Sequence, residues 1–335
     1  MHHTFKKFFI VLFIFTIAAC NREPRVTIGL LMDDFTTERW AKDRDIFVRR
    51  ANELDAKVIV KIAHGDQDKQ ILQAKQLIDT GVNILVVVPC DFEKSAPIVD
   101  IAHNASIKVI AYDRLIRNAN LDFYISFDNT EVGRLQAEYI TKAKPVGKYA
   151  LIGGSTKDNN AYLVQLGQME ILQPLVVKGD ILIACNQFVD EWTKEEGYKK
   201  TKECLDEHPD IDAIIAGNDV LASGALEAIN EYKLPQKVLV AGQDADLAAC
   251  KRILIGQQSM TVYKPIEKLA IPAAEMALRL STNKPTPDFC SSIHNGYKWV
   301  PSMLLTPIAV NVETIKMTVV ADGYQEEKSI YDSSN

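Results

Sequence analysis

Several patterns that would indicate catalysis or nucleotide binding are missing from this 335-residue chain. It has no GxGxxG or GxxxxGK, which phosphate-binding loops use, and no GxSxG, which marks a nucleophilic serine. Gly153-Gly154-Ser155 follows a predicted strand but is only a fragment of such a loop. The six histidines follow no metal-ligand or triad spacing. These absences argue against an enzyme and against a nucleotide or metal cofactor.

Cysteine is scarce, and no CxxC or CxxH occurs. One of the six cysteines, Cys20, ends the apolar N-terminal segment, and the others are spread widely: Cys90, Cys185, Cys204, Cys250 and Cys290. This spacing predicts neither a metal site nor a small disulfide scaffold. We expect these five side chains to act mainly as small buried apolar groups, with at least one free thiol.

The chain also lacks a run of basic residues. Its formal charge is −6, and without Lys6 and Lys7 of the N-terminal segment it would be about −8. A mildly acidic surface without a basic patch argues against nucleic acid as a partner.

The first twenty residues form a targeting segment. Lys6 and Lys7 precede an uninterrupted apolar run, Phe8–Ala19, which is too short for a mature membrane span. The segment ends Ile17-Ala18-Ala19-Cys20 and resembles the lipobox of bacterial lipoproteins. That resemblance implies export, acylation at Cys20 and a periplasmic or cell-surface protein that is anchored to a membrane without crossing it.

After residue 24 the sequence alternates strand-like and helix-like segments. Strands are predicted over 25–32, 57–62, 84–88 and 108–112, and helices over 39–54, 66–80 and 95–105. The segment Ile84–Val88 is apolar without alternation, as a strand covered on both faces should be. Such βαβ repetition predicts a parallel sheet with right-handed connections.

The same alternation begins again near Phe127 and predicts a second lobe. The fold class is therefore α/β, with two doubly wound parallel-sheet lobes joined by crossover strands. We assign 1–20 to the signal peptide and lipobox, 25–127 with about 265–292 to the N-terminal lobe, and 128–264 with about 293–323 to the C-terminal lobe. Strand-like residues at 299–305 leave open a further return to the first lobe.

Polar residues recur where the predicted strands end, which is where open α/β sheets bind ligands. They are 33–40 after the first strand, Asp113 and Arg114 after the fourth, and then Asn218, Asp219, Gln243, Asp244 and Lys264 in the second half. Carboxylates, guanidinium groups and amides together suit sugar hydroxyls, each of which both donates and accepts. Trp40 and Trp192 could pack against the apolar C–H faces of a sugar ring.

Plainer interpretations stay open for each of these residues. Asp113 and Arg114 could form a strand-end ion pair, although adjacent residues point in different directions and two separate partners are more natural. Asn218 and Asp219 could simply cap the following helix. Trp40 and Trp192 could belong to the core.

Several ordered blocks resemble the type I periplasmic sugar-binding proteins, and more narrowly the D-xylose-binding proteins of bacterial ABC transporters. The blocks are ERWAKDRDIF, AYDR, DFYISFDN, DNNA, GQDADLAACKRI, MTVYKPI and PSMLLTPI, within Val26 to about Gly323. The resemblance implies a two-lobed fold with three crossovers. It also implies a sugar site made of Arg39, Trp40, Asp113, Arg114, Asn160, Trp192, Asn218, Asp244 and Lys264.

Two stretches depart from the family pattern. PCDFEKS follows ILVVV, where these relatives carry an aromatic residue and an asparagine, and DEW replaces Asp-Gly-Trp before Trp192. We place Asp91 and Asn159 at the rim of the site.

The resemblance also implies a function. It predicts a monomeric binding protein that closes on D-xylose or a related aldose and delivers it to an ABC transporter permease. A sugar-sensing subunit that presents ligand to a membrane sensor kinase or chemoreceptor is the alternative. A related DNA-binding repressor is disfavoured, because no helix-turn-helix precedes Val26.

Overall fold

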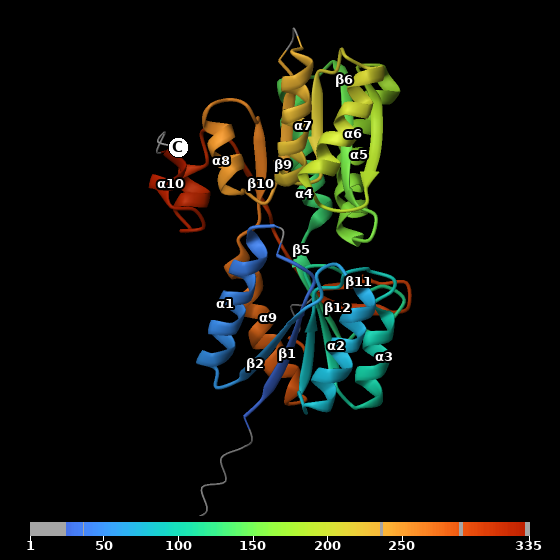
Figure 1. Cartoon of the computed structure of the whole chain (residues 1–335), viewed down its shortest axis with the longest axis vertical. Helices are drawn as coiled ribbons and strands as arrows, with labels where there is room; N and C mark the ends of the chain where they lie inside the picture. Colours follow the sequence, from blue (N-terminus) through green and yellow to red (C-terminus); the bar gives the residue numbers. More distant parts are fainter. Residues whose placement is uncertain (1–24, 36, 235–236, 288–290, 332–335) are drawn as a thin grey trace, which may run out of the picture.

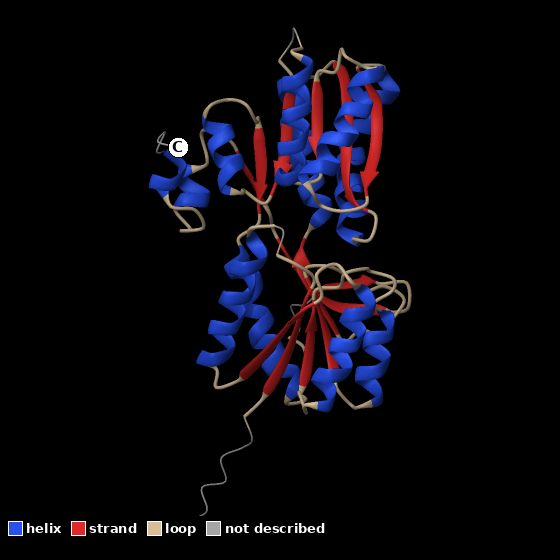
Figure 2. Cartoon of the chain, viewed as in Figure 1, coloured by secondary structure: helices blue, strands red, loops and turns tan. Residues whose placement is uncertain are grey.

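The computed structural model describes residues 25–35, 37–234, 237–287 and 291–331. The predicted signal peptide, lipobox and Cys20 lie outside these residues, as does Cys290. The described chain forms two lobes, drawn one above the other in Figure 1, each with a central sheet and helices on both sides (Figure 2). The predicted α/β fold class is confirmed.

The sheet of the first lobe has seven strands among the described residues. In spatial order they are β11 (Ser291–His294), β12 (Trp299–Leu305), β5 (Phe123–Phe127), β4 (Lys108–Tyr112), β3 (Ile84–Val87), β1 (Thr27–Met32) and β2 (Lys57–Ile62). All neighbouring pairs are parallel except β11 with β12. Every residue of β3 is buried, as its unbroken apolar run predicted.

The sheet of the second lobe has six strands in the same described part of the chain. Their order is β13 (Ile308–Val310), β10 (Met260–Tyr263), β9 (Leu239–Gln243), β8 (Ala213–Ala216), β6 (Gly147–Ser155) and β7 (Ile181–Val189). Only the short edge strand β13 is antiparallel to its neighbour. Both sheets therefore direct the carboxyl ends of their parallel strands to one edge, where ligand sites form.

Apolar helix faces cover both sides of each sheet and make four cores. In the first lobe α1 (Arg39–Glu53) and α9 (Ile266–Ser281) cover one face, and α2 (Gln67–Asp79) and α3 (Ala96–Asn104) the other. In the second lobe the two faces are covered by α4 (Asn129–Ala143) with α5 (Asn159–Lys178), and by α6 (Lys194–Glu207) with α7 (Asp219–Tyr232). The remaining elements are α8 (Leu247–Leu254), a π-helix (Lys316–Val320) and α10 (Glu327–Tyr331), which packs against α8.

Along the described residues, the chain crosses between the sheets three times. The crossings follow β5, β10 and β12, since β5 leads into α4, β10 into α9, and β12 into β13. We had assigned residues from about 293 to the C-terminal lobe, but Trp299–Leu305 pairs with β5 in the first sheet. The last boundary therefore lies between Leu305 and Ile308.

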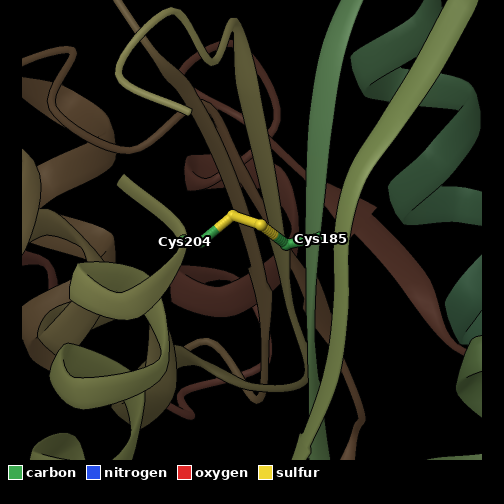
Figure 3. The surroundings of a disulfide bond; sticks show 2 residues. All are labelled: Cys185 and Cys204. Carbon is green, nitrogen blue, oxygen red and sulfur yellow. A yellow bond between two sulfur atoms is a disulfide. The ribbon is translucent and has the colours of Figure 1, made fainter. Parts of the chain in front are cut away.

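The cysteines differ from expectation in one respect. Cys185 on β7 and Cys204 on α6 form a disulfide across a core of the second lobe (Figure 3). Cys90 and Cys250 are free and buried, as predicted. The expectation of a mainly apolar role was wrong for Cys185 and Cys204, because their separation of 19 residues gave no sign that a strand and a helix would bring them together.

Within the described ranges, no helix is both long enough and apolar enough to cross a bilayer.

Candidate functional site

A cavity lies between the two lobes at the carboxyl ends of their strands. All nine residues predicted for the sugar site line it: Arg39, Trp40, Asp113, Arg114, Asn160, Trp192, Asn218, Asp244 and Lys264. Thr37, Asn129, Asp158 and Gln243 also line it and were not among the predicted site residues. Both lobes thus contribute polar groups to one site.

Arg39 is the central cation on the first lobe. Its Nη2 lies 2.8 Å from Asp113 Oδ2, its Nε lies 3.0 Å from Asp43 Oδ2, and its Nη1 lies 3.8 Å from Asp244 Oδ1 of the second lobe. Burial alone would lower the pKa of Arg39, but these three carboxylates outweigh it and hold the pKa well above its ordinary value. Arg39 therefore stays charged in the closed cavity.

Asp43 holds Arg39 in place from within α1. It is fully buried one turn after Arg39, and its Oδ1 also accepts a hydrogen bond from the Tyr112 hydroxyl. Because Asp43 binds both Arg39 and the end of β4, it fixes the guanidinium relative to the strand end. The spacing of Arg39 and Asp43 fits an i,i+4 pair on a helix, but nothing in the sequence marks Asp43 as buried.

Asp113 has a left-handed backbone, with φ of 62°. Its carbonyl oxygen accepts hydrogen bonds from Ser126 Oγ, Tyr124 OH and Asn160 Nδ2, and its N–H donates to Ile125 O. Burial raises the pKa of Asp113, but Arg39, Lys264 and Arg114 more than compensate, so the pKa is lowered. The carboxylate is thus an ionised acceptor facing the cavity.

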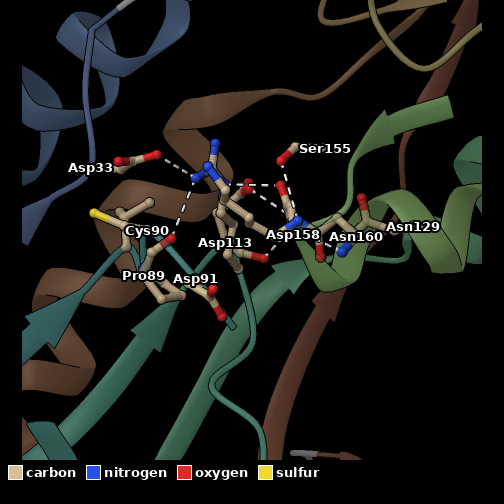
Figure 4. A network of polar contacts seen from close by, with 12 residues as sticks. Asp33, Pro89, Cys90, Asp91, Asp113, Asn129, Ser155, Asp158 and Asn160 are labelled. Carbon is tan, nitrogen blue, oxygen red and sulfur yellow. Dashed lines mark hydrogen bonds and ion pairs between the residues drawn. The ribbon is translucent and has the colours of Figure 1, made fainter. Parts of the chain in front are cut away.

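Arg114 binds two carboxylates and not its neighbour Asp113. Nη1 lies 2.6 Å from Asp33 Oδ2 in the first lobe, and Nε lies 2.9 Å from Asp158 Oδ2 in the second. Nη1 also donates to Pro89 O. Figure 4 shows Asp33 and Pro89 on one side of this network and Asp158 and Asn160 on the other. The prediction that the adjacent pair has separate partners is confirmed.

Asp244 and Lys264 form the corresponding pair in the second lobe, where Lys264 Nζ lies 2.8 Å from Asp244 Oδ1. Both side chains are buried. A cation and an acid from each lobe therefore face the same cavity.

The two tryptophans lie in different surroundings. Trp40 is buried, with the guanidinium carbons of Arg39 and Arg114 at 4.6 and 5.5 Å from its ring centroid. Trp192 lies against the backbone of Gly154, where an added Cβ would approach the ring to 1.9 Å. Gly154 therefore makes room for the indole, which explains the second glycine of the pair that resembled part of a phosphate loop.

Apart from Asp244 Oδ1, which is ion-paired with Lys264, three buried polar atoms of cavity residues in the second lobe have no hydrogen-bond partner in the described chain. They are Asn160 Oδ1, Trp192 Nε1 and Gln243 Oε1. An unpaired buried polar group costs about 1 to 3 kcal/mol. A ligand with hydroxyl groups could satisfy both the two acceptors and the indole donor.

Asn218 combines two of the proposed roles. Its Oδ1 accepts the Leu221 N–H and caps α7, as the plainer interpretation predicted, and the residue also lines the cavity. The amide nitrogen is left to face a ligand while the oxygen holds the helix.

The two predicted rim residues do not line the cavity. Asp91 accepts hydrogen bonds from Glu93 N and Lys94 N and so stabilises its own turn. Asn159 is buried as the first residue of α5. Asn159 directly precedes the cavity residue Asn160, whereas neither neighbour of Asp91 lines the cavity. The assignment of both residues to the rim is therefore corrected.

The lobes also meet outside the cavity through Phe92. Its N–H donates to Lys157 O of the second lobe at 3.0 Å. Its ring centroid lies 6.0 Å from that of Tyr162, which in turn lies 4.9 Å from that of Phe188. This aromatic row joins the loop after β3 to α5 and β7.

A buried carboxylate supports the Asp244 loop from behind. Asp219 accepts hydrogen bonds from Asp246 N, Thr261 Oγ1 and Gln258 Nε2. Burial raises the pKa of Asp219 to about 7, and burial together with Asp219 raises the pKa of Asp246 to about 8. The loop that carries Asp244 is therefore held by Asp219 and contains Asp246, two carboxyl groups that titrate near neutral pH.

No group of three or more His, Cys, Asp or Glu side chains within the described ranges is arranged to hold a metal ion.

Residues 28–285 match the family model described as "Periplasmic binding protein domain". The chain belongs to this family. Among curated members, it is 46% identical to the D-xylose-binding periplasmic protein of Haemophilus influenzae over 95% of both chains. It is also 46% identical to the protein of the same name from Escherichia coli, over 95% of this chain and 96% of the other.

A solved member of the family has the same arrangement of lobes. An ABC transporter solute-binding protein from Clostridium phytofermentans, with bound β-D-glucose, superposes with a TM-score of 0.85 at 26% identity. The match covers 91% of this chain and 99% of that one. The predicted membership among periplasmic sugar-binding proteins is confirmed, and this periplasmic binding protein fold places the cavity between its lobes.

Proposed function

We propose that this protein binds an aldose, with D-xylose the favoured ligand, between its two lobes and delivers it to an ABC transporter permease. One observation carries the proposal. The cavity joins charged donors and acceptors from both lobes with two tryptophans and three unpartnered polar atoms.

The side chains divide the work of holding a sugar. Asp113 and Asp244 accept from hydroxyl groups, while Arg114, Lys264 and the amides of Asn160 and Asn218 donate to them. Charge-assisted bonds of this kind are about twice as strong as neutral ones. Trp40 and Trp192 offer aromatic surface to the C–H faces of the ring.

The preference for xylose rests on the relatives. The two curated proteins that carry D-xylose in their names share 46% of their residues with this chain over nearly its whole length. Every residue that the resemblance assigned to the site lies at the cavity.

Binding and lobe closure are coupled in this proposal. The structure has the lobes in contact through Arg114 with Asp158 and through Arg39 with Asp244. A sugar that touches both lobes stabilises this closed form over an open one, since it binds the closed form better. The protein carries its ligand without converting it.

Delivery to a permease fits a lipid-anchored, monomeric protein outside the cytoplasm. Acylation at Cys20 would hold the protein at a membrane surface, where a permease can receive the sugar. Mass spectrometry of the mature chain tests the anchor, and uptake of labelled xylose in cells with and without the gene tests delivery.

Calorimetry with a panel of pentoses and hexoses tests the ligand. We expect D-xylose to bind at micromolar concentration or below, which for about ten heavy atoms requires roughly 0.8 kcal/mol per atom. Xylitol, which has the hydroxyls but no ring, is the matched control ligand. Absence of binding by every aldose would overturn the proposal.

A further inference from the structure

A second junction between the lobes centres on Glu38, which lies outside the cavity. Its Oε1 accepts hydrogen bonds from Lys42 Nζ at 2.8 Å and from Gln325 Nε2 at 3.1 Å. Its Oε2 accepts the Leu247 N–H at 3.2 Å. Glu38 immediately precedes Arg39 in the first lobe, whereas Leu247 begins α8 in the second.

The contact with Leu247 supplies a helix cap from the opposite lobe. The N-cap residue of α8, Asp246, makes no capping hydrogen bond with its own side chain. The first N–H groups of a helix need acceptors, and a negative charge at this end is favourable. Glu38 provides both across the boundary between the lobes.

The same carboxylate acts on the loop that carries Asp244. Gln325, which is buried, donates to Glu38 and also to the carbonyl oxygen of Ala245 at 3.3 Å. Asp244 and Ala245 both have left-handed backbones, with φ of 98° and 53°. A strained loop of this kind keeps its shape only where its surroundings hold it.

The C-terminal segment completes the junction. Tyr324 O accepts a hydrogen bond from Lys42 Nζ at 2.9 Å, and the Lys42 ammonium lies 4.3 Å from the centroid of the Tyr324 ring. The following helix, α10, packs against α8. Residues 324–325 therefore contact the Asp244 loop through Gln325 and contact α1 through Tyr324.

Glu38 is ionised in this arrangement. Burial raises its pKa, but the hydrogen bonds from Lys42, Gln325 and Leu247 outweigh burial and leave the pKa lowered.

We propose that Glu38 is a positioning residue that couples closure of the lobes to the orientation of the Asp244 loop. When the lobes meet, Glu38 caps α8 and, through Gln325, fixes Ala245, so that Asp244 points into the cavity. When they separate, the cap is lost and the loop loosens. The effect on sugar binding rests on the proposed function, because it requires that Asp244 hold the ligand.

The experiment uses the full-length mature protein with three variants. Glu38→Ala removes the cap, Glu38→Gln keeps an oxygen acceptor but no charge, and Glu195→Ala removes an exposed acid from the first turn of α6. Stopped-flow fluorescence with D-xylose gives the rate constants for association and dissociation. Hydrogen exchange of the peptide that contains Leu247 reports on the cap with and without sugar.

Loss of an N-cap acceptor lowers the equilibrium constant for forming the capped helix by about tenfold. We expect Glu38→Ala to dissociate about tenfold faster with association within about twofold of the parent, because the cap exists only in the closed form. Exchange at Leu247 should rise by a similar factor, Glu38→Gln should recover about half of both effects, and Glu195→Ala should match the parent.

Unchanged dissociation and exchange in Glu38→Ala, or equal changes in Glu195→Ala, would overturn the inference. If the parent protein binds no aldose, the proposed function fails by itself. The role of Glu38 is then decided in proteins whose lobes are held together by a thiol cross-linker between Phe92→Cys and Tyr162→Cys, two positions whose rings are in contact across the lobes. Faster exchange of Leu247 in the cross-linked Glu38→Ala protein supports the cap, and equal exchange refutes it.

Discussion

Asp113 and Asp244 occupy equivalent places in the two lobes. Each directly follows a parallel strand, β4 or β9, and each has a left-handed backbone. Each donates its N–H to a carbonyl of the next strand, Ile125 O or Val262 O, at 2.8 Å. Each carboxylate lies within 4 Å of Arg39. Both lobes therefore place an aspartate with a left-handed backbone beside the same arginine.

Two substitutions of Asp113 distinguish the effect of its charge from the effect of its left-handed backbone. Asparagine and aspartate tolerate the left-handed region, whereas alanine pays about 1 kcal/mol or more there. We expect both variants to lose stability in urea unfolding, because the buried Arg39 loses a charge partner, and Asp113→Ala to lose about 1 kcal/mol more than Asp113→Asn. Both should weaken sugar binding by about 1 to 3 kcal/mol, because Arg39 and the sugar lose an ionised acceptor. Unchanged affinity in a folded Asp113→Ala protein would reduce Asp113 to a structural ion-pair partner.

The aromatic row at Phe92 should govern how long a sugar stays bound. Phe92→Ala removes the ring contact with Tyr162 across the lobes. Aromatic pairs contribute about 0.5 to 1.5 kcal/mol, so dissociation should accelerate about two- to tenfold with little change in association. Phe188→Ala, which removes a stacking partner within the second lobe, is the control in stopped-flow measurements. Equal dissociation rates in both variants would argue against a cross-lobe effect.

Stability should fall as the pH rises through the range in which Asp219 and Asp246 titrate. Their folded pKa values of about 7 and about 8 lie above the ordinary value of about 3.9, so the folded state binds more protons than the unfolded state between these limits. This contribution is fully favourable below about pH 4 and is lost by about pH 8.

Asp246→Asn tests that pH dependence, because it removes the carboxylate that faces Asp219, Asp244, Glu38 and Arg252. The variant should gain about 1 to 2 kcal/mol over the parent at pH 8 and little at pH 5. Denaturation at the two pH values measures the difference. Asp100→Asn, an exposed site on α3, should show no such change, and a flat profile in the parent would contradict the prediction.

Reduction of the Cys185–Cys204 bond should destabilise the second lobe. A bond that closes a loop of about 20 residues contributes about 3 kcal/mol, mostly by restricting the unfolded chain. Unfolding by urea with and without reductant measures this loss. In the double variant Cys185→Ala, Cys204→Ala the reductant should have no effect, since Cys90 and Cys250 are already free. An equal effect of reductant on both proteins would refute the assignment.

Most of the fold could be predicted, because the hydrophobic periodicity of a long segment indicates whether it forms a helix or a strand. The helix expected over 39–54 is observed at Arg39–Glu53, and the strand expected over 108–112 is observed at those residues. Strands β11 and β13 were not predicted, because each is short and depends on neighbours from distant parts of the chain. Strand β13, for example, exists only where β10 pairs with it.

The candidate site divides in the same way. Residues at strand ends, such as Asp113 and Lys264, were found because topology alone brings strand ends together. Asp43 and Asp158 were not, since nothing local distinguishes a buried partner of an arginine from an ordinary polar residue of a helix or a cap. Gly154 was noticed for the wrong reason, because its role depends on where Trp192 lies.

The three crossings of the chain also set the order in which the molecule can be made. The first sheet begins at Thr27 but receives β12 only at Leu305, and the second receives its edge strand at Ile308. Neither lobe can therefore reach its final form until nearly all of the chain has emerged from the ribosome or from a translocation pore. Such late, distant pairings fold slowly, and slow folding would suit the export that the N-terminal segment predicts, because a chain crosses a translocation pore before it folds.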